Sequence, residues 1–217
     1  MTSLSMVCYR TPIKVGWKSV MAGKRLILAA VIALGMAAAP AVAQFTGPDS
    51  EKFVAAVRER DGSKAIELLQ GRPTVVNARD GKGDTGLIVA IGGRDPDWTG
   101  YLLNHGADPN LPARNGDTPL IAAARVGFDD AVQWLINRKV KVDADNRMGE
   151  TALIVAVQQR HIPVIKRLLA AGANPDKADS AAGYSARDYA KRDTRMPELL
   201  RLIEAAKTPA APAKLKF

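Results

Sequence analysis

The sequence predicts an all-α solenoid of about five helix-turn-helix units with short β-hairpin loops. The leading observation is a repeat of nearly the same residues 33 positions apart, at 83–88 (Gly-Asp-Thr-Gly-Leu-Ile), 116–121 (Gly-Asp-Thr-Pro-Leu-Ile) and 149–154 (Gly-Glu-Thr-Ala-Leu-Ile). A fixed period of this size is typical of stacked units, none of which can bury its apolar face alone. Such a stack excludes most single-core enzyme folds and indicates a protein that works through an extended surface.

The first 43 residues are predicted to be a signal peptide. Lys24 and Arg25 are followed by an apolar run at 26–39 and by Pro-Ala-Val-Ala at 40–43, which is a pattern for cleavage after Ala43. A bilayer span needs about 20 apolar residues, so cleavage is favoured over an uncleaved anchor, which stays an alternative. Met21 is a second candidate start codon. We therefore expect a periplasmic or secreted protein.

Charge and cysteine content limit the function classes. The leader holds five Lys or Arg residues and no acid, so the net charge falls from +9 in the whole chain to +4 in the mature one. That charge is small and interspersed, which argues against a nucleic-acid footprint. The only cysteine, Cys8, lies in the leader, so packed faces rather than disulfides must hold the mature chain together. We expect a monomer that does not bind membranes after cleavage.

Each repeat is predicted to contain two helices. A threonine hydroxyl caps the first helix, at Thr85, Thr118 and Thr151. Small residues at one buried position let neighbouring helices approach closely, and these are Ala90, Ala123, Ala156 and Ala190. The second helix ends at a glycine free to adopt a positive φ, Gly106 or Gly172. Lys139 takes that place in the middle repeat, where we expect it to cost stability.

The ends of the repeat region are predicted to be capping units. After a linker at 44–48, an N-terminal cap at 49–82 is expected to hold helices at 51–59 and 63–70. Full repeats follow at 83–115, 116–148 and 149–181. A C-terminal cap at 182–207 starts from a displaced copy of the repeat and closes with a helix near 196–206. The Pro/Ala/Lys tail at 208–217 is expected to be disordered.

The repeat resembles the ankyrin repeat family over residues 49–207. The specific parts are Gly-x-Thr-Pro-Leu at 116–120 and Leu-Leu-x-x-Gly-Ala-x-x-Asn at 102–110. One departure is consistent, because Ile88, Ile121 and Ile154 stand where the family usually has histidine. The resemblance implies a helix, a turn, a helix and a hairpin loop per unit, with apolar packing in place of the histidine's hydrogen bond.

Candidate chemistry is sparse. Residues 81–86 spell the phosphate-binding pattern G-x-G-x-x-G, but polar residues rather than an apolar strand precede them. His105 and His161 fall at different phases of the repeat and have no second ligand at metal spacing. No serine lies in a nucleophile elbow. We therefore expect no catalytic residue, cofactor or metal ion.

Three aromatic residues, Trp98, Tyr101 and Trp134, are candidates for core packing or for contact with a partner. Tyr101 and Trp134 occupy equivalent positions on second helices, which favours packing between repeats. Trp98 follows Asp-Pro-Asp and is expected to be more exposed, as a modest candidate for a contact anchor.

The resemblance implies a partner-binding groove formed by hairpin tips and the exposed side of the first helices. Carried over position by position, the groove residues are Lys82, Asp84, Arg114, Asn115, Asp117, Arg125, Arg147, Met148, Glu150 and Gln158. For the acids, an alternative is a solvated carboxylate that only stabilises a helix N-terminus. For the bases, the alternative is an ordinary solvated face.

The expected function is non-catalytic binding of a protein partner along this groove, as an interaction module or scaffold. The alternative is an accessory inhibitor or immunity-type factor that occludes an exported enzyme or toxin.

Overall fold

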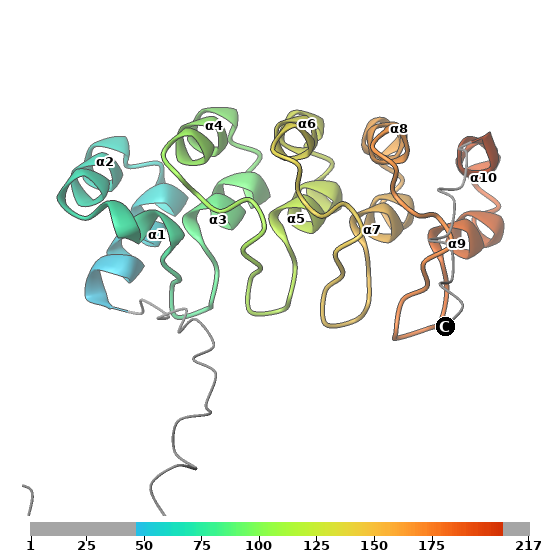
Figure 1. The fold of residues 1–217 in the computed structure, drawn as a ribbon, viewed down its shortest axis with the longest axis horizontal. Coiled ribbons are helices and arrows are strands. Elements are labelled where there is room, and N and C mark those ends of the chain that lie inside the picture. Colours follow the sequence, from blue (N-terminus) through green and yellow to red (C-terminus); the bar gives the residue numbers. More distant parts are fainter. Residues whose placement is uncertain (1–46, 206–217) are drawn as a thin grey trace, which may run out of the picture. The chain divides into compact units, whose positions relative to one another are not determined.

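The computed structural model describes residues 47–205, which form a stack of five helix pairs (Figure 1). The predicted signal peptide, most of the 44–48 linker and the 208–217 tail lie outside the described residues. Inner helices form one row and outer helices a second row, and hairpin loops extend beyond the inner row. The inner helices are α1 (Pro48–Glu59), α3 (Gly86–Gly92), α5 (Pro119–Val126), α7 (Ala152–Gln158) and α9 (Ala186–Arg192). The outer helices are α2 (Gly62–Gly71), α4 (Pro96–Asn104), α6 (Asp129–Asn137), α8 (Ile162–Ala170) and α10 (Pro197–Ala205).

The all-α repeat solenoid predicted from the sequence is confirmed. Each inner helix packs against the next inner helix and against its own outer helix, and a 3-10 turn, η1 (Pro73–Asn77), follows α2. The helix α1 begins at Pro48, three residues before the expected start, because proline is favoured at the first helical position. Of the residues that the structure covers, no helix is both long and apolar enough to span a bilayer.

The predicted threonine caps are present in all three full repeats. The hydroxyls of Thr85, Thr118 and Thr151 each accept a hydrogen bond, 3.3 Å long, from the N–H three residues later. Those N–H groups belong to the isoleucines that replace the family's histidine. Ile121 and Ile154 are fully buried, so apolar packing does occupy the histidine position.

In the three full repeats the outer helices α4, α6 and α8 are each followed, as predicted, by a residue with positive φ. Gly106 and Gly172 have φ of 88° and 87°, and Lys139 takes the same place with φ of 56°. A side chain in this left-handed region costs about 1 kcal/mol relative to glycine. Lys139 is therefore a local source of instability in the middle repeat.

The core is one continuous cluster along the stack. The predicted small residues belong to this cluster, and Ala90, Ala123, Ala156 and Ala190 are all buried. Tyr101 and Trp134 pack against this cluster from the outer helices, as expected. Trp98 is half-buried beside Tyr101, with ring centroids 5.3 Å apart. Because Trp98 belongs to the outer helix α4, it lies apart from the hairpin loops.

Thr99 is the exception in this core, because its hydroxyl is buried without a hydrogen-bond partner. The equivalent residues one and two repeats later are Val132 and Ile165, both fully buried. Replacing the hydroxyl by a methyl group should remove an unsatisfied buried donor, which costs about 1–3 kcal/mol. We expect Thr99→Val to raise the free energy of unfolding by about 1 kcal/mol in urea titrations. Thr99→Ser keeps the hydroxyl and should not gain stability. A Val variant no more stable than the parent would contradict this account.

Candidate functional site: the hairpin edge

Four hairpins, at 80–85, 113–118, 146–151 and 179–185, line up along one side of the stack and together are termed the hairpin edge (Figure 1). Each hairpin contains the same type of backbone hydrogen bond, in which the N–H of its first residue donates to the carbonyl of the residue before the helix N-cap. Its N···O distance is 2.9 Å at Asp80, 2.9 Å at Ala113, 3.1 Å at Asn146 and 3.0 Å at Asp179. The hairpins therefore project their tips in a common register.

A polar side chain inside each hairpin fixes the shape of its tip. Asp80 accepts hydrogen bonds from the N–H groups of Lys82 and Asp84, at 3.0 and 2.9 Å. In the third and fourth hairpins, Asn146 and Asp179 likewise each accept two hydrogen bonds from backbone N–H groups. Ala113 cannot, and Asn115 instead accepts from the N–H of Asp117, at 2.9 Å.

These turn-forming residues were missed in the sequence analysis. An Asp or Asn three or four residues before the hairpin glycine, at Asp80, Asn146 and Asp179, was the available signal. The substitution of Asn115 for the missing side chain at Ala113 had no such signal, because it occurs once.

Side chains from the inner helices hold the buried hairpin carboxylates. Burial alone would raise the pKa of Asp80, but hydrogen bonds from Arg58, at 2.7 Å, and from two backbone N–H groups hold that pKa below its ordinary value. Burial acts in the same direction on Asp179. There the hydroxyl of Tyr189, at 2.6 Å, and backbone donors again lower the pKa. The lowered pKa values favour the carboxylate form of both residues, which accepts the hydrogen bonds that shape the turns.

Two of the ten predicted groove residues lie inside the hairpin edge rather than on its surface. Asp117 and Glu150 are only 5% and 9% exposed. Asn146 donates to both carboxylates, at 2.8 and 2.9 Å. The guanidinium of Arg125 binds Asp117 at 3.0 Å and lies 3.7 Å from Glu150. These acids are therefore neither exposed contacts nor simple solvated caps, because they join neighbouring repeats from within.

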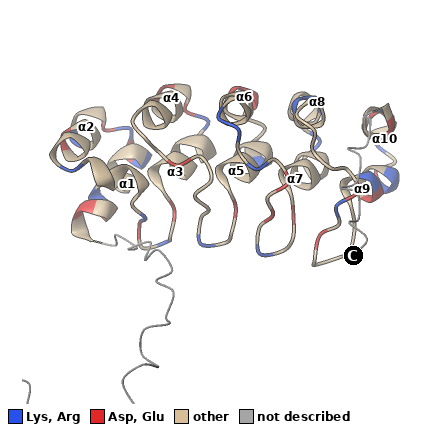
Figure 2. Ribbon diagram, in the orientation of Figure 1, with Lys and Arg blue, Asp and Glu red and all other residues tan. Residues whose placement is uncertain are grey.

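The three predicted basic residues of the tips are exposed. Lys82, Arg114 and Arg147 occupy successive hairpins, and Figure 2 shows basic residues at the tips of the hairpins before α3, α5 and α7. Arg114 donates to the carbonyl of Gly81 at 3.0 Å, which lays its stem across the neighbouring tip. The edge thus presents positive charge outward while Asp117 and Glu150 face inward.

The remaining predicted residues divide between tip and helix. Asn115 is exposed, and Met148 is 50% exposed at its tip. Asp84 and Gln158 are half-buried, the first beside Lys82 and the second at the end of α7. The hairpin edge therefore offers mainly Lys82, Arg114, Asn115, Arg147 and Met148 to solvent.

The local structure explains the apparent phosphate motif and the two histidines. Gly83 turns the first hairpin, and Gly86 lies in α3 where an added Cβ would come 3.0 Å from Phe53. His105 stacks on Tyr101 with ring centroids 3.8 Å apart, and His161 faces the carbonyl of Arg125 at 3.3 Å. Within residues 47–205, no group of three His, Cys, Asp or Glu side chains is arranged to hold a metal ion.

Comparison with known families agrees with this geometry. Residues 53–146 and 99–179 match the family model for ankyrin repeats (3 copies). The two matches together cover more than half of the chain. The chain belongs to the ankyrin repeat family. No curated protein matches the sequence. Ankyrin repeats form protein–protein interaction modules, and the family is generally non-catalytic. The hairpin edge of this ankyrin repeat protein carries exposed basic groups at three successive tips, Lys82, Arg114 and Arg147.

Proposed function

We propose that this protein is a non-catalytic binding module that acts in the periplasm or outside the cell and docks a protein partner along the hairpin edge. The observation that carries the proposal is the array of exposed side chains at successive hairpin tips, where hydrogen bonds to Asp80, Asn115 or Asn146 fix the backbone of the tip. A backbone fixed in this way loses little conformational entropy when a partner binds, which favours affinity. The predicted export signal supports the compartment.

Photo-crosslinking in intact cells tests this surface. A photoreactive amino acid replaces Lys82 at a hairpin tip or, as a matched control, Lys166 on the outer helix α8; both are exposed. We expect a discrete protein adduct from position 82 and none from position 166. A second variant, Arg114→Glu with Arg147→Glu, should reduce that adduct roughly tenfold, because rim charges control encounter with a partner.

Two results would overturn the docking proposal: equal adducts from both positions, or an undiminished adduct in the doubly substituted protein whose circular dichroism is unchanged. If the captured partner is an exported enzyme or toxin, its activity should be assayed with and without this protein. Loss of activity would then favour the inhibitor or immunity-type function over a scaffold.

Mass spectrometry of the N-terminus tests the compartment separately. A mature chain that begins at Gln44 supports export with cleavage. An intact apolar run at 26–39 in a membrane-bound protein would contradict cleavage and would indicate that the protein is anchored to the membrane.

A further inference from the structure

The two large apolar side chains most exposed in residues 47–205 lie on adjacent hairpins. Met148 is 50% exposed and Tyr184 is 36% exposed. The two hairpins are joined by a hydrogen bond from the N–H of Ser180 to the carbonyl of Met148, at 2.8 Å. With Arg147 and Arg192, these residues are termed the Met148–Tyr184 patch. Rigid aromatic and apolar side chains among arginines are typical of the residues that dominate binding energy at protein interfaces.

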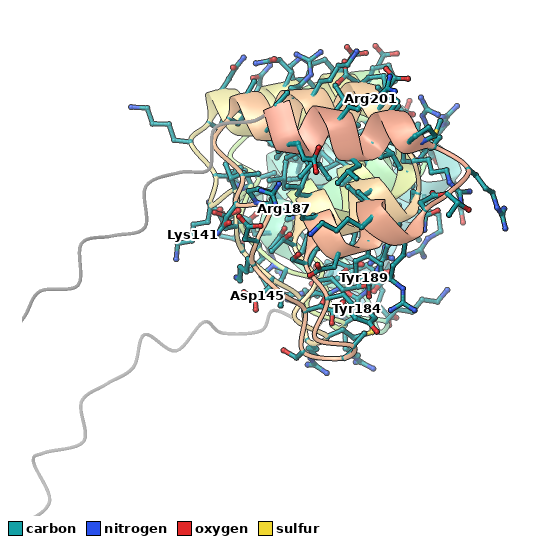
Figure 3. All side chains as sticks on the ribbon, turned by 90° about the vertical axis from the view of Figure 1, so that its right-hand side faces the viewer. Lys141, Asp145, Tyr184, Arg187, Tyr189 and Arg201 are labelled. Carbon is teal, nitrogen blue, oxygen red and sulfur yellow. The ribbon has the colours of Figure 1, made fainter. Side chains whose placement is uncertain are left out.

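The tyrosine of this patch is held in place before any partner arrives. Its ring meets that of Tyr189 edge-on, with centroids 5.7 Å apart, and the guanidinium of Arg192 lies 4.4 Å from its centroid. Tyr189 is fixed in turn by its hydrogen bond to Asp179. Figure 3 shows Tyr184 and Tyr189 together near the hairpins at the C-terminal end of the stack. A held ring keeps its rotamer on binding, which lowers the entropic cost.

A shallow cavity continues the patch onto the inner helices. It has a volume of about 400 Å³ and shares Tyr189 and Arg192 with the surroundings of Tyr184. Its other lining residues include Gln158, Thr194 and Arg195. The patch and cavity together offer a path for a short extended segment rather than a single contact.

The carboxylates near this region already have partners within the protein. Asn146 and Tyr189 donate hydrogen bonds to Glu150 and Asp179, which keep their charge but have fewer free acceptor positions, and Asp193 forms an ion pair with Arg160. The guanidinium groups of Arg147 and Arg192 have no carboxylate within ion-pair distance in the part of the chain that the structure describes, whereas Arg195 interacts electrostatically with Asp193. Unpaired arginines beside an apolar anchor favour a ligand with both carboxylates and an apolar side chain.

We propose that the Met148–Tyr184 patch and its cavity bind an acidic segment of the protein partner, whose apolar or aromatic side chain packs on Met148 and Tyr184 between carboxylates paired with Arg147 and Arg192. This inference rests on the proposed function and names the chemistry of the partner. A peptide fits better than a nucleic acid, because a phosphate backbone needs a longer basic track and would leave the apolar anchor unused.

A defined peptide tests the proposal. The probe is an eight-residue peptide with a central tryptophan–leucine pair flanked by aspartate and glutamate, added to ¹⁵N-labelled protein expressed from the full-length gene. We expect the largest amide shifts at Met148, Ser180, Tyr184 and Arg192. Arg192→Glu and Met148→Ser should each weaken binding roughly tenfold, whereas Lys166→Glu on the outer helix should not. Raising the salt from about 50 to 300 mM should weaken binding further.

Three outcomes would overturn it: shifts located elsewhere, equal binding of the same peptide with lysines replacing its acids, or tighter binding of a single-stranded oligonucleotide. A peptide with serine in place of tryptophan and leucine should bind roughly tenfold more weakly. Equal affinity would contradict the proposed packing of an apolar side chain on Met148 and Tyr184. The crosslink from position 82 distinguishes failure of this inference from failure of the proposed function. If that adduct persists while the acidic peptide fails, the partner docks on the hairpin edge but lacks the chemistry inferred here.

Discussion

Leu120→Ala should lower the free energy of unfolding by about 3 kcal/mol, because it leaves a cavity in a closely packed core. Leu120 is 1% exposed on α5, which packs against α3, α6 and α7 at the centre of the stack. A repeat protein is stabilised mainly by contacts between neighbouring units, so one central cavity weakens both halves at once. In urea titrations followed by circular dichroism and tryptophan fluorescence, we expect a lower midpoint with an unchanged slope.

The matched control removes the same atoms from a residue outside the core. Leu111 is half-buried in a loop and does not belong to the core cluster or its packed neighbours. Leu111→Ala should therefore cost less than about 1 kcal/mol. Equal losses at the two positions would show that the continuous core does not set the stability of the stack.

Much of the fold could be predicted because ankyrin-type stacking is encoded locally and repeated. The threonine that caps a helix and the glycine that ends one act within a few residues of their own position. Thr118 and Gly106 therefore take the expected conformations. Lys139 follows the same rule at a cost, since the repeat imposes a positive φ on a side chain that disfavours it.

The candidate site was less predictable because burial at the hairpin edge depends on partners far apart in sequence. Asp117 and Glu150 occupy the same position of the repeat as the half-buried Asp84. Their burial depends on Arg125 and Asn146, and the first hairpin lacks this pair, since Gly92 stands at the position equivalent to Arg125. The repeat pattern likewise places Tyr184 only within the C-terminal cap at 182–207, whereas its exposure and its contact with Arg192 make it a binding candidate.

The burial of acids and exposure of bases has a consequence for specificity. Positive charge on the hairpin edge favours partners with acidic surfaces and repels basic ones, chiefly through the rate of encounter. Because Asp117 and Glu150 bind Arg125 and Asn146, the same acids that would have neutralised the edge instead connect its hairpins. The pairs that connect the hairpins therefore also leave the basic side chains as the exposed charges of the hairpin edge.

Gly116→Ala should be as damaging as a core cavity, at about 3 kcal/mol, through two separate effects. Gly116 has φ of 87°, a conformation that costs an alanine about 1 kcal/mol. An added Cβ would also lie 2.7 Å from the backbone nitrogen of Arg147 on the next hairpin. Backbone cannot move aside as a flexible side chain can, and such overpacking costs about 1–3 kcal/mol more.

Gly106→Ala isolates the first effect, because Gly106 has φ of 88° and nothing within 4 Å of an added Cβ. It should cost only about 1 kcal/mol, and thermal or urea unfolding of the two variants gives the difference. Equal losses would mean that adjacent hairpins do not constrain each other. If the difference is found, Gly116→Ala should also weaken partner capture at position 82 more than Gly106→Ala does. The overlap should displace Arg147 relative to Arg114, and the affinity of a rigid partner depends on the distance between these two side chains.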